Sequence, residues 1–93
     1  MIKSFRHKGL ELFFKTGSIS GIQAKHIKKL RLQLTVLNRA TKPDDMAALS
    51  WQLHPLKGAD LKGHWAVSVN GNWRLTFKFD GTDVIVVDYQ DYH

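Results

Sequence analysis

The 93-residue sequence contains no cysteine, only two prolines, and no apolar run of the roughly 20 residues that a membrane-spanning helix requires. The absence of cysteine excludes disulfide bonds and thiolate metal clusters, and it is compatible with a reducing compartment. Residues 1–14 lack the uninterrupted apolar segment of a secretory signal. We therefore expect a cytoplasmic protein that has no contact with a membrane.

Acidic residues are scarce, above all in the first half of the chain. Fourteen Lys and Arg stand against eight Asp and Glu, for a formal net charge of +6. Residues 1–43 hold ten Lys and Arg against Glu11 alone, whereas residues 44–93 hold four against seven acids, so the two parts carry +9 and −3. This asymmetry is typical of proteins that bind RNA, DNA or an acidic protein. A solvated basic helix face explains the charge equally well.

Size and composition indicate one globular domain over residues 1–93, because 43% of the chain is hydrophobic and only 24% is charged. A chain of this length buries roughly 60 to 68% of its unfolded surface, which is enough for a single thin core. An active site in such a domain must be open or shallow.

The first half of the chain predicts two helices after a short strand. Residues 1–5 alternate like a strand, and Leu10, Phe13 and Phe14 then recur at helical spacing until Gly17. Ser20 and Gln23 have the spacing of a capping box, which predicts that a long helix begins at Ser20. Its apolar stripe comprises Ile22, Ile27, Leu30, Leu34, Val36 and Leu37, and its basic residues are Lys25, Lys28, Lys29, Arg31 and Arg39. Residues 41–44 end that helix, and Pro43 allows a further turn.

The second half predicts a loop followed by an antiparallel sheet. Residues 51–63 have the composition of extended chain and loop, and strands are expected at 64–69, 73–79 and 84–89, with a turn at 80–82. A three-residue loop at 70–72 pairs Val69 with Trp73, Val67 with Leu75 and Trp65 with Phe77, so that all six side chains face the helices.

This register places Arg74 on the opposite face of the sheet, together with Ser68 and Thr76. That face is polar and is not needed by the helices. We therefore expect a ligand to bind around Arg74.

Titratable residues occur in two further places. His54 precedes Pro55, which favours extended backbone, and Gly58 permits a turn just after Lys57. The last strand runs directly into Asp91, Tyr92 and His93. Taken singly, a His before Pro is usually an ordinary surface residue, and chain ends are usually frayed.

Taken together, these residues have the chemistry that RNA cleavage requires. RNA carries its own nucleophile, so a base, an acid and cations on the phosphate are sufficient. His suits both proton transfers near neutral pH, and the planar Arg guanidinium matches two phosphate oxygens. The set comprises His54, Lys57, Arg74 and His93, with Asp91 and Tyr92 beside them. The sequence has no His-Glu-x-x-His motif, phosphate-binding Gly loop or nucleophile elbow, and its five scattered His residues make only a weak case for a metal.

Four short strings carry a resemblance to a known family. They are Met-Ile-Lys-Ser-Phe at residues 1–5, His-Pro-Leu-Lys-Gly at 54–58, Asn-Trp-Arg at 72–74 and Asp-Tyr-His at 91–93. In order, spacing and total length the chain resembles the HigB toxins of the RelE/ParE-like superfamily.

The resemblance implies an α/β (α+β) fold of the RelE-like microbial ribonuclease type, with two N-terminal helices packed on a curved, mainly antiparallel sheet. It implies a toxin that is a ribosome-dependent endoribonuclease, or mRNA interferase, and that cuts mRNA in the A site of the 70S ribosome. It also implies a HigA-like helix-turn-helix antitoxin, through which alone the toxin would meet operator DNA, and no cofactor.

The same resemblance assigns residue roles. His54, Asp91, Tyr92 and His93 form the implied catalytic group, with Arg74 on the phosphate and with Lys57 and Asn72 contacting the messenger. Which His is base and which is acid stays open, as do the codon preference and the antitoxin docking surface.

Two other functions remain compatible with the sequence. A non-catalytic RNA- or ribosome-binding module would use the basic helix face and would make the His, Arg and Lys set incidental. A ParE-like relative would poison DNA gyrase, although such relatives generally lack a His-rich set.

Overall fold

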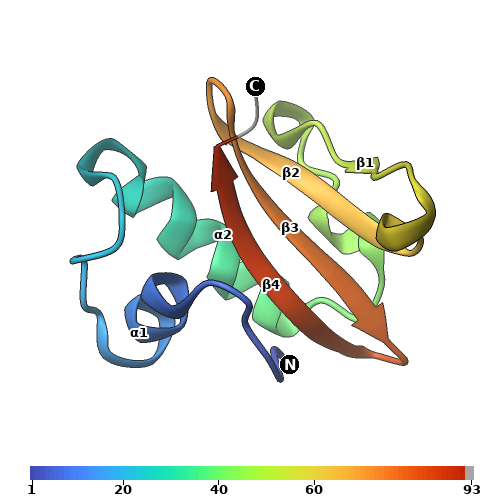
Figure 1. Cartoon of the computed structure of the whole chain (residues 1–93), viewed down its shortest axis with the longest axis horizontal. Helices are drawn as coiled ribbons and strands as arrows, with labels where there is room; N and C mark the ends of the chain where they lie inside the picture. Colours follow the sequence, from blue (N-terminus) through green and yellow to red (C-terminus); the bar gives the residue numbers. More distant parts are fainter. Residues whose placement is uncertain (92–93) are drawn as a thin grey trace.

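The protein, seen in a computed structural model that describes residues 1–91, is an antiparallel four-stranded sheet with helices packed against one of its faces (Figure 1). The strands are β1 (His54–Pro55), β2 (His64–Asn70), β3 (Trp73–Asp80) and β4 (Asp83–Asp91), and they lie side by side in chain order. The α-helices are α1 (Lys8–Thr16) and α2 (Ile27–Arg39), and the short 3-10 turns are Ala24–His26, Pro43–Met46, Leu49–Trp51 and Ala59–Leu61. The predicted α+β fold with an antiparallel sheet is confirmed.

Helix α1 has an identifiable cap at each end. The Nδ1 atom of His7 accepts the backbone N–H of Leu10 at 2.9 Å, so an imidazole satisfies one of the unpaired amides of the first turn. At the other end Gly17 has a φ of 80°, and its N–H donates to the carbonyl of Phe13. The helix therefore ends where the sequence predicted, with Leu10 and Phe13 buried.

The start of α2 differs from the prediction. No side chain caps this region, and the Ser20 hydroxyl lies 3.3 Å from that of Ser18. The Gln23 amide, which a capping box would have used, donates instead to the Tyr89 hydroxyl of β4 at 3.4 Å. The connection also folds back on α1, because a Cβ at Gly21 would lie 2.9 Å from the Cα of Gly9. A 3-10 turn therefore comes first, and α2 begins at Ile27.

The predicted apolar stripe of α2 faces the sheet. Leu30, Leu34 and Leu37 are buried, whereas the basic side chains Lys25, Lys28, Arg31 and Arg39 are exposed. The helix ends at Arg39, and Pro43 opens the following 3-10 turn, as the sequence predicted.

The β2–β3 hairpin keeps the predicted register along most of its length. Val67 pairs with Leu75 and Trp65 pairs with Phe77. At the turn, however, Asn70 pairs with Trp73, so the loop is one residue shorter than predicted and Val69 lies in a bulge. Such a bulge interrupts the ladder, and the buried Gln33 side chain of α2 donates its Nε2 to the carbonyl of Ser68 at 2.9 Å. The irregularity therefore depends on a helix residue that is distant in sequence.

A second bulge lies in β4. Thr76 pairs with Asp88 but Lys78 pairs with Ile85, so β4 carries one extra residue here, and Val86 has a φ of 49°. Beyond this point Val87 and Tyr89 face the helices and are buried, while Asp88 and Gln90 lie on the other face.

The predicted N-terminal strand is present as two parallel bridges along β4. Ile2 is bridged to Val84 and Phe5 to Val87. The Ser4 hydroxyl also accepts the N–H of Val86 at 2.9 Å, so the first residues hold the bulge from outside.

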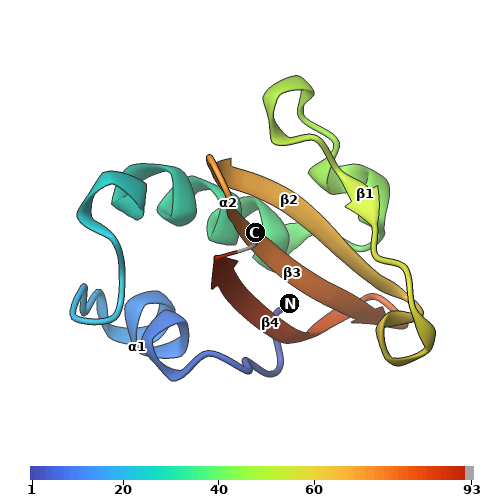
Figure 2. The same ribbon diagram turned by 45° about the horizontal axis from the view of Figure 1, so that its top comes forward.

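The two faces of the sheet have different surroundings. One core lies between the helices and the sheet, and its largest fully buried apolar side chains include Phe77, Leu10, Leu30, Leu37, Met46 and Leu75. The other face, which we call the open face, carries Ser68, Arg74, Asp88 and Gln90, and residues 52–63 run along its β2 edge (Figure 2). Within residues 1–91 no helix is long and apolar enough to cross a membrane.

Candidate active site

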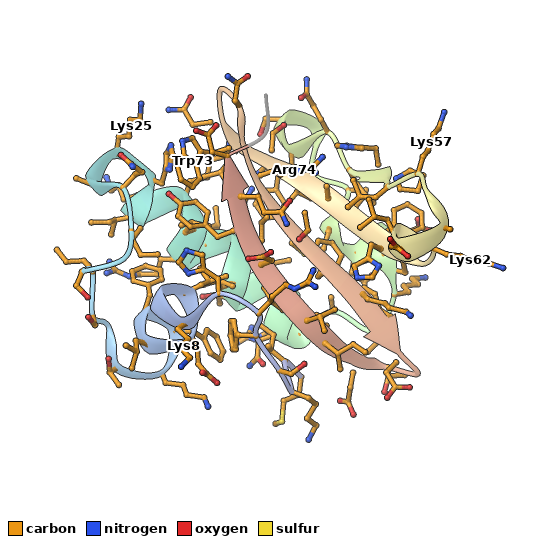
Figure 3. The ribbon with its side chains drawn as sticks, in the orientation of Figure 1. Lys8, Lys25, Lys57, Lys62, Trp73 and Arg74 are labelled. Atoms are coloured by element: carbon orange, nitrogen blue, oxygen red, sulfur yellow. The ribbon has the colours of Figure 1, made fainter. Side chains whose placement is uncertain are left out.

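A hollow of about 440 Å³ lies between the segment around β1 and the turn end of the β2–β3 hairpin. Its lining comprises His54, Pro55, Leu56, Lys57, Leu61, Ser68, Gly71, Asn72, Trp73 and Arg74. Four predicted site residues, His54, Lys57, Asn72 and Arg74, are therefore brought together from two segments of the chain. Figure 3 labels two of them, Lys57 just after β1 and Arg74 on β3. None of the described lining residues is acidic, so the hollow suits an anion.

Arg74 stands at the centre of three neighbouring strands. It is paired with Ser68 on β2 and with Gln90 on β4, so these three side chains share the open face. Its Nη2 donates to the Gln90 Oε1 at 3.3 Å, and the Gln90 Nε2 donates to the Asp88 Oδ2 at 2.8 Å. This chain of hydrogen bonds along β4 orients the guanidinium.

His54 lies on β1 with its side chain exposed, and its Nδ1 lies 2.8 Å from the backbone carbonyl oxygen of Gln52. A carbonyl oxygen can only accept a hydrogen bond, so Nδ1 carries the hydrogen. In the neutral imidazole the lone pair is then on Nε2, the nitrogen that can exchange a proton with a bound molecule.

Of the three predicted site residues at the end of the chain, only Asp91 is described, and it does not line the hollow. Asp91 ends β4 opposite Trp73, and strand alternation places it on the face of Tyr89 rather than that of Gln90. Tyr92 and His93 lie outside the described residues.

An aromatic cluster supports the hollow from the helix side. Trp73 packs against Tyr89 with a ring separation of 4.5 Å, and the Tyr89 hydroxyl lies 2.6 Å from the His26 Nδ1. Burial lowers the pKa of His26, and the nearby Lys25 and Lys29 lower it further. Burial also raises the pKa of Tyr89, so both groups are neutral at pH 7. This neutral pair joins the start of α2 to the end of β4.

Gln52 and Gln90 do not line the hollow but form hydrogen bonds with residues that do, and the sequence indicated neither of them. Gln52 adopts a left-handed backbone conformation with a φ of 52°. Glycine or asparagine at this position would have indicated such a conformation, but glutamine does not. Gln90 follows the predicted end of the last strand, and alternation beyond Tyr89 could have placed it beside Arg74. Among residues 1–91 no group of three or more His, Cys, Asp or Glu is arranged to hold a metal ion.

Comparison with known proteins identifies the family to which this chain belongs. A family model described as the RelE-like toxin of the type II toxin-antitoxin system HigB matches residues 3–93. The chain belongs to the HigB-like toxin family. This HigB-like toxin is also 42% identical over 93 residues to the Endoribonuclease HigB of Proteus vulgaris, and the match covers the full length of both chains.

Membership in the HigB-like toxin family confirms the resemblance seen in the sequence. A toxin of a type II system has an antitoxin as its partner, so the HigB-like toxin has one too. The match itself assigns no role to any residue.

Proposed function

We propose that this HigB-like toxin is an endoribonuclease that cuts mRNA in the A site of the ribosome and thereby inhibits translation. The observation that carries the proposal is the hollow in which His54, Lys57 and Arg74 meet without an acidic side chain among the described lining residues. The name of the Proteus vulgaris relative supports the same activity.

The reaction uses the 2′-hydroxyl of the RNA as its nucleophile. A base removes the 2′ proton, the 2′ oxygen bonds to the adjacent phosphorus, and the bond from phosphorus to the 5′ oxygen breaks. An acid protonates the departing 5′ oxygen. The products are a 2′,3′-cyclic phosphate and a 5′-hydroxyl, and no covalent enzyme intermediate is required.

His54 and His93 share the two proton transfers in this proposal. The bond from the His54 Nδ1 to the Gln52 carbonyl supports a role for Nε2 in either direction, since Nε2 accepts a proton in the neutral ring and donates one in the charged ring. Asp91 orients a neighbouring group, and Tyr92 stacks on a base or assists a proton transfer.

The cations stabilise the charge that develops on the phosphate. The Arg74 guanidinium offers planar donors that match two phosphate oxygens, and the exposed Lys57 adds a point charge at the rim. Asn72, in the turn between β2 and β3, contacts the messenger.

Exposed basic residues in the first half of α2 and in the 3-10 turn before it supply a surface for partners. Lys25, Lys28 and Arg31 are solvent-accessible and lie outside the hollow, so they are available to ribosomal RNA or to the antitoxin. We expect the antitoxin to be HigA-like, with a helix-turn-helix domain that alone contacts operator DNA, and we expect the system to act in the cytoplasm.

A translation extract tests this function. We expect labelled mRNA to be cut only when toxin and ribosomes are both present, with fragments ending in a 2′,3′-cyclic phosphate. His54→Ala should keep the fold and abolish cutting. Ribosome binding without any cleavage would indicate a basic binding module instead, and supercoiling defects without cleavage would indicate a gyrase poison.

A further inference from the structure

Gln52 has an uncommon backbone conformation beside the hollow. With φ 52° and ψ 48° it lies in the left-handed region, which residues other than glycine and asparagine rarely adopt. Such conformations persist only where the surrounding structure holds them, and they concentrate at functional sites. The hydrogen-bond partners of Gln52 show what this residue holds in place.

Two hydrogen bonds leave Gln52 in different directions. Its backbone carbonyl accepts the Nδ1–H of His54 at 2.8 Å, and its side-chain Oε1 accepts the hydroxyl hydrogen of Ser68 at 3.0 Å. Ser68 is the β2 residue paired with Arg74. Gln52 thus links the imidazole on the exposed edge strand to the strand that lies next to the guanidinium.

The backbone conformation matters for the first of these bonds. A left-handed residue reverses the chain locally, and here it turns the carbonyl of Gln52 toward a ring only two residues ahead. Without that acceptor, the exposed imidazole would exchange between its two neutral tautomers. Only the tautomer with hydrogen on Nδ1 leaves the lone pair on Nε2.

We propose that Gln52 is a positioning residue that fixes the tautomer and orientation of His54 relative to Arg74, through its left-handed backbone and its bond to Ser68. This inference rests on the proposed ribonuclease function. It names a residue that acts through His54 rather than on the RNA.

Three variants separate the effect of the Gln52 backbone conformation from the effect of its side-chain hydrogen bond. Gln52→Gly keeps the left-handed backbone accessible but removes the bond to Ser68, and Ser68→Ala removes the same bond from the other partner. Gln52→Val removes the bond and also disfavours the left-handed backbone, because valine is β-branched.

The first readout is the tautomer of His54, measured by nitrogen-15 NMR of the imidazole in the full-length protein. We expect hydrogen on Nδ1 in the wild type, a mixed signal in Gln52→Gly and Ser68→Ala, and loss of the Nδ1–H form in Gln52→Val. Hydrogen on Nε2 in the neutral wild-type ring would overturn the proposal, whatever the ribonuclease activity.

The second readout is the kinetics of ribosome-dependent cleavage. For Gln52→Val we expect kcat to fall about tenfold or more with little change in KM, by analogy with the loss found when the hydrogen-bond partner of a metal-ligating His is removed. Gln52→Gly and Ser68→Ala should each lose less, and the double variant should lose no more than either one. Unchanged kcat in Gln52→Val, or additive losses in the double variant, would contradict the link.

The two readouts keep the two proposals apart. A wild type that shows the Nδ1–H tautomer but cuts no mRNA would contradict the proposed function and leave the geometry of His54 intact. If Gln52→Val does not fold, as judged by circular dichroism, the tautomer signals and rates of Gln52→Gly and Ser68→Ala decide the proposal.

Discussion

Arg74 and His54 occupy different environments in the same hollow. Arg74 is half-buried and is oriented by its hydrogen bond to Gln90. His54 is exposed, and its ring is held by a hydrogen bond to the backbone carbonyl of Gln52. The guanidinium is therefore preorganised by the sheet, and the imidazole depends on a loop.

Exchange of Arg74 tests the guanidinium directly. Arg74→Lys keeps the positive charge but loses the planar pair of donors, so we expect kcat for mRNA cleavage to fall about 100-fold, the range found when one stabilising donor is removed. Fragment formation in a translation extract measures the rate. Arg39→Lys makes the same exchange at the exposed end of α2 and should leave the rate unchanged. Equal rates for the two variants would contradict the role of Arg74.

His26 gives a prediction for stability against pH. Its pKa is lowered in the folded protein by burial and by the neighbouring Lys25 and Lys29, so the unfolded chain binds the proton more readily. The contribution of neutral His26 is complete above about pH 6.5, the ordinary value for His, and is lost as the pH falls through the lowered pKa.

Urea unfolding at pH 7.5 and pH 5 measures this effect. We expect a smaller free energy of unfolding at pH 5, and we expect His26→Gln to reduce the difference because glutamine does not titrate. A pH dependence that is the same in both proteins would mean that other groups cause it.

Some of the residue chemistry could be predicted from sequence and some could not. Arg74 was placed on the open face because the alternation of Trp73, Leu75 and Phe77 is clear. Gln52 could not be found, because no glycine or asparagine marks its left-handed backbone and its side-chain partner Ser68 lies 16 residues away in the chain.

At the scale of elements, local sequence signals predicted the end of α1 better than the beginning of α2. The end of α1 follows from Gly17, whose backbone requirement is local. The beginning of α2 is decided by Tyr89, which lies on another strand and takes the Gln23 amide. Both bulges likewise depend on distant partners, namely Gln33 and Ser4.

The bulge in β4 yields a prediction of its own. Val86 has a φ of 49°, which is strained for a β-branched residue, so Val86→Gly exchanges lost packing for relieved strain. We expect the free energy of unfolding to stay within about 1 kcal/mol of the wild type. The matched exchange Val87→Gly removes a fully buried side chain and should cost about 2 kcal/mol or more. Urea denaturation compares the two, and equal losses would contradict strain at Val86.

At the scale of the whole molecule, the N-terminus and the hollow lie at opposite ends of the sheet. The Met1 amino group is 3.7 Å from Asp83, which follows the β3–β4 turn, whereas Asn72 and Asp91 lie at the other end of β3 and β4 (Figure 1). Additions to the two chain ends therefore meet different parts of the protein.

Tags on the two ends test the proposed role of His93. A tag before Met1 should leave mRNA cleavage unchanged, whereas the same tag after His93 should lower it about tenfold or more, because it alters a proposed acid–base residue. Cleavage rates of the two fusions in one extract give the comparison. An active C-terminal fusion would remove His93 from the proposal.

The whole-molecule prediction succeeded because it combined distant strings. The segments at 54–58, 72–74 and 91–93 are individually short, and their joint order and spacing indicated the family that the match over residues 3–93 confirms. Contacts between these segments could not be read from spacing alone.

The extra residue in β4 sets which side chains the last strand offers to solvent. The run Val84 to Val87 is apolar throughout. It contains no apolar–polar alternation that could determine on which face of the sheet the later side chains lie. If a strand of the same length paired without the bulge, strict alternation from the buried Val84 would put Asp88 in the hydrophobic interior and turn the ring of Tyr89 out to solvent. Deleting Val86 would instead leave Thr76 opposite Asp88 and Leu75 opposite Tyr89, so the toxin tolerates a shorter run here but not an unbulged run of the present length.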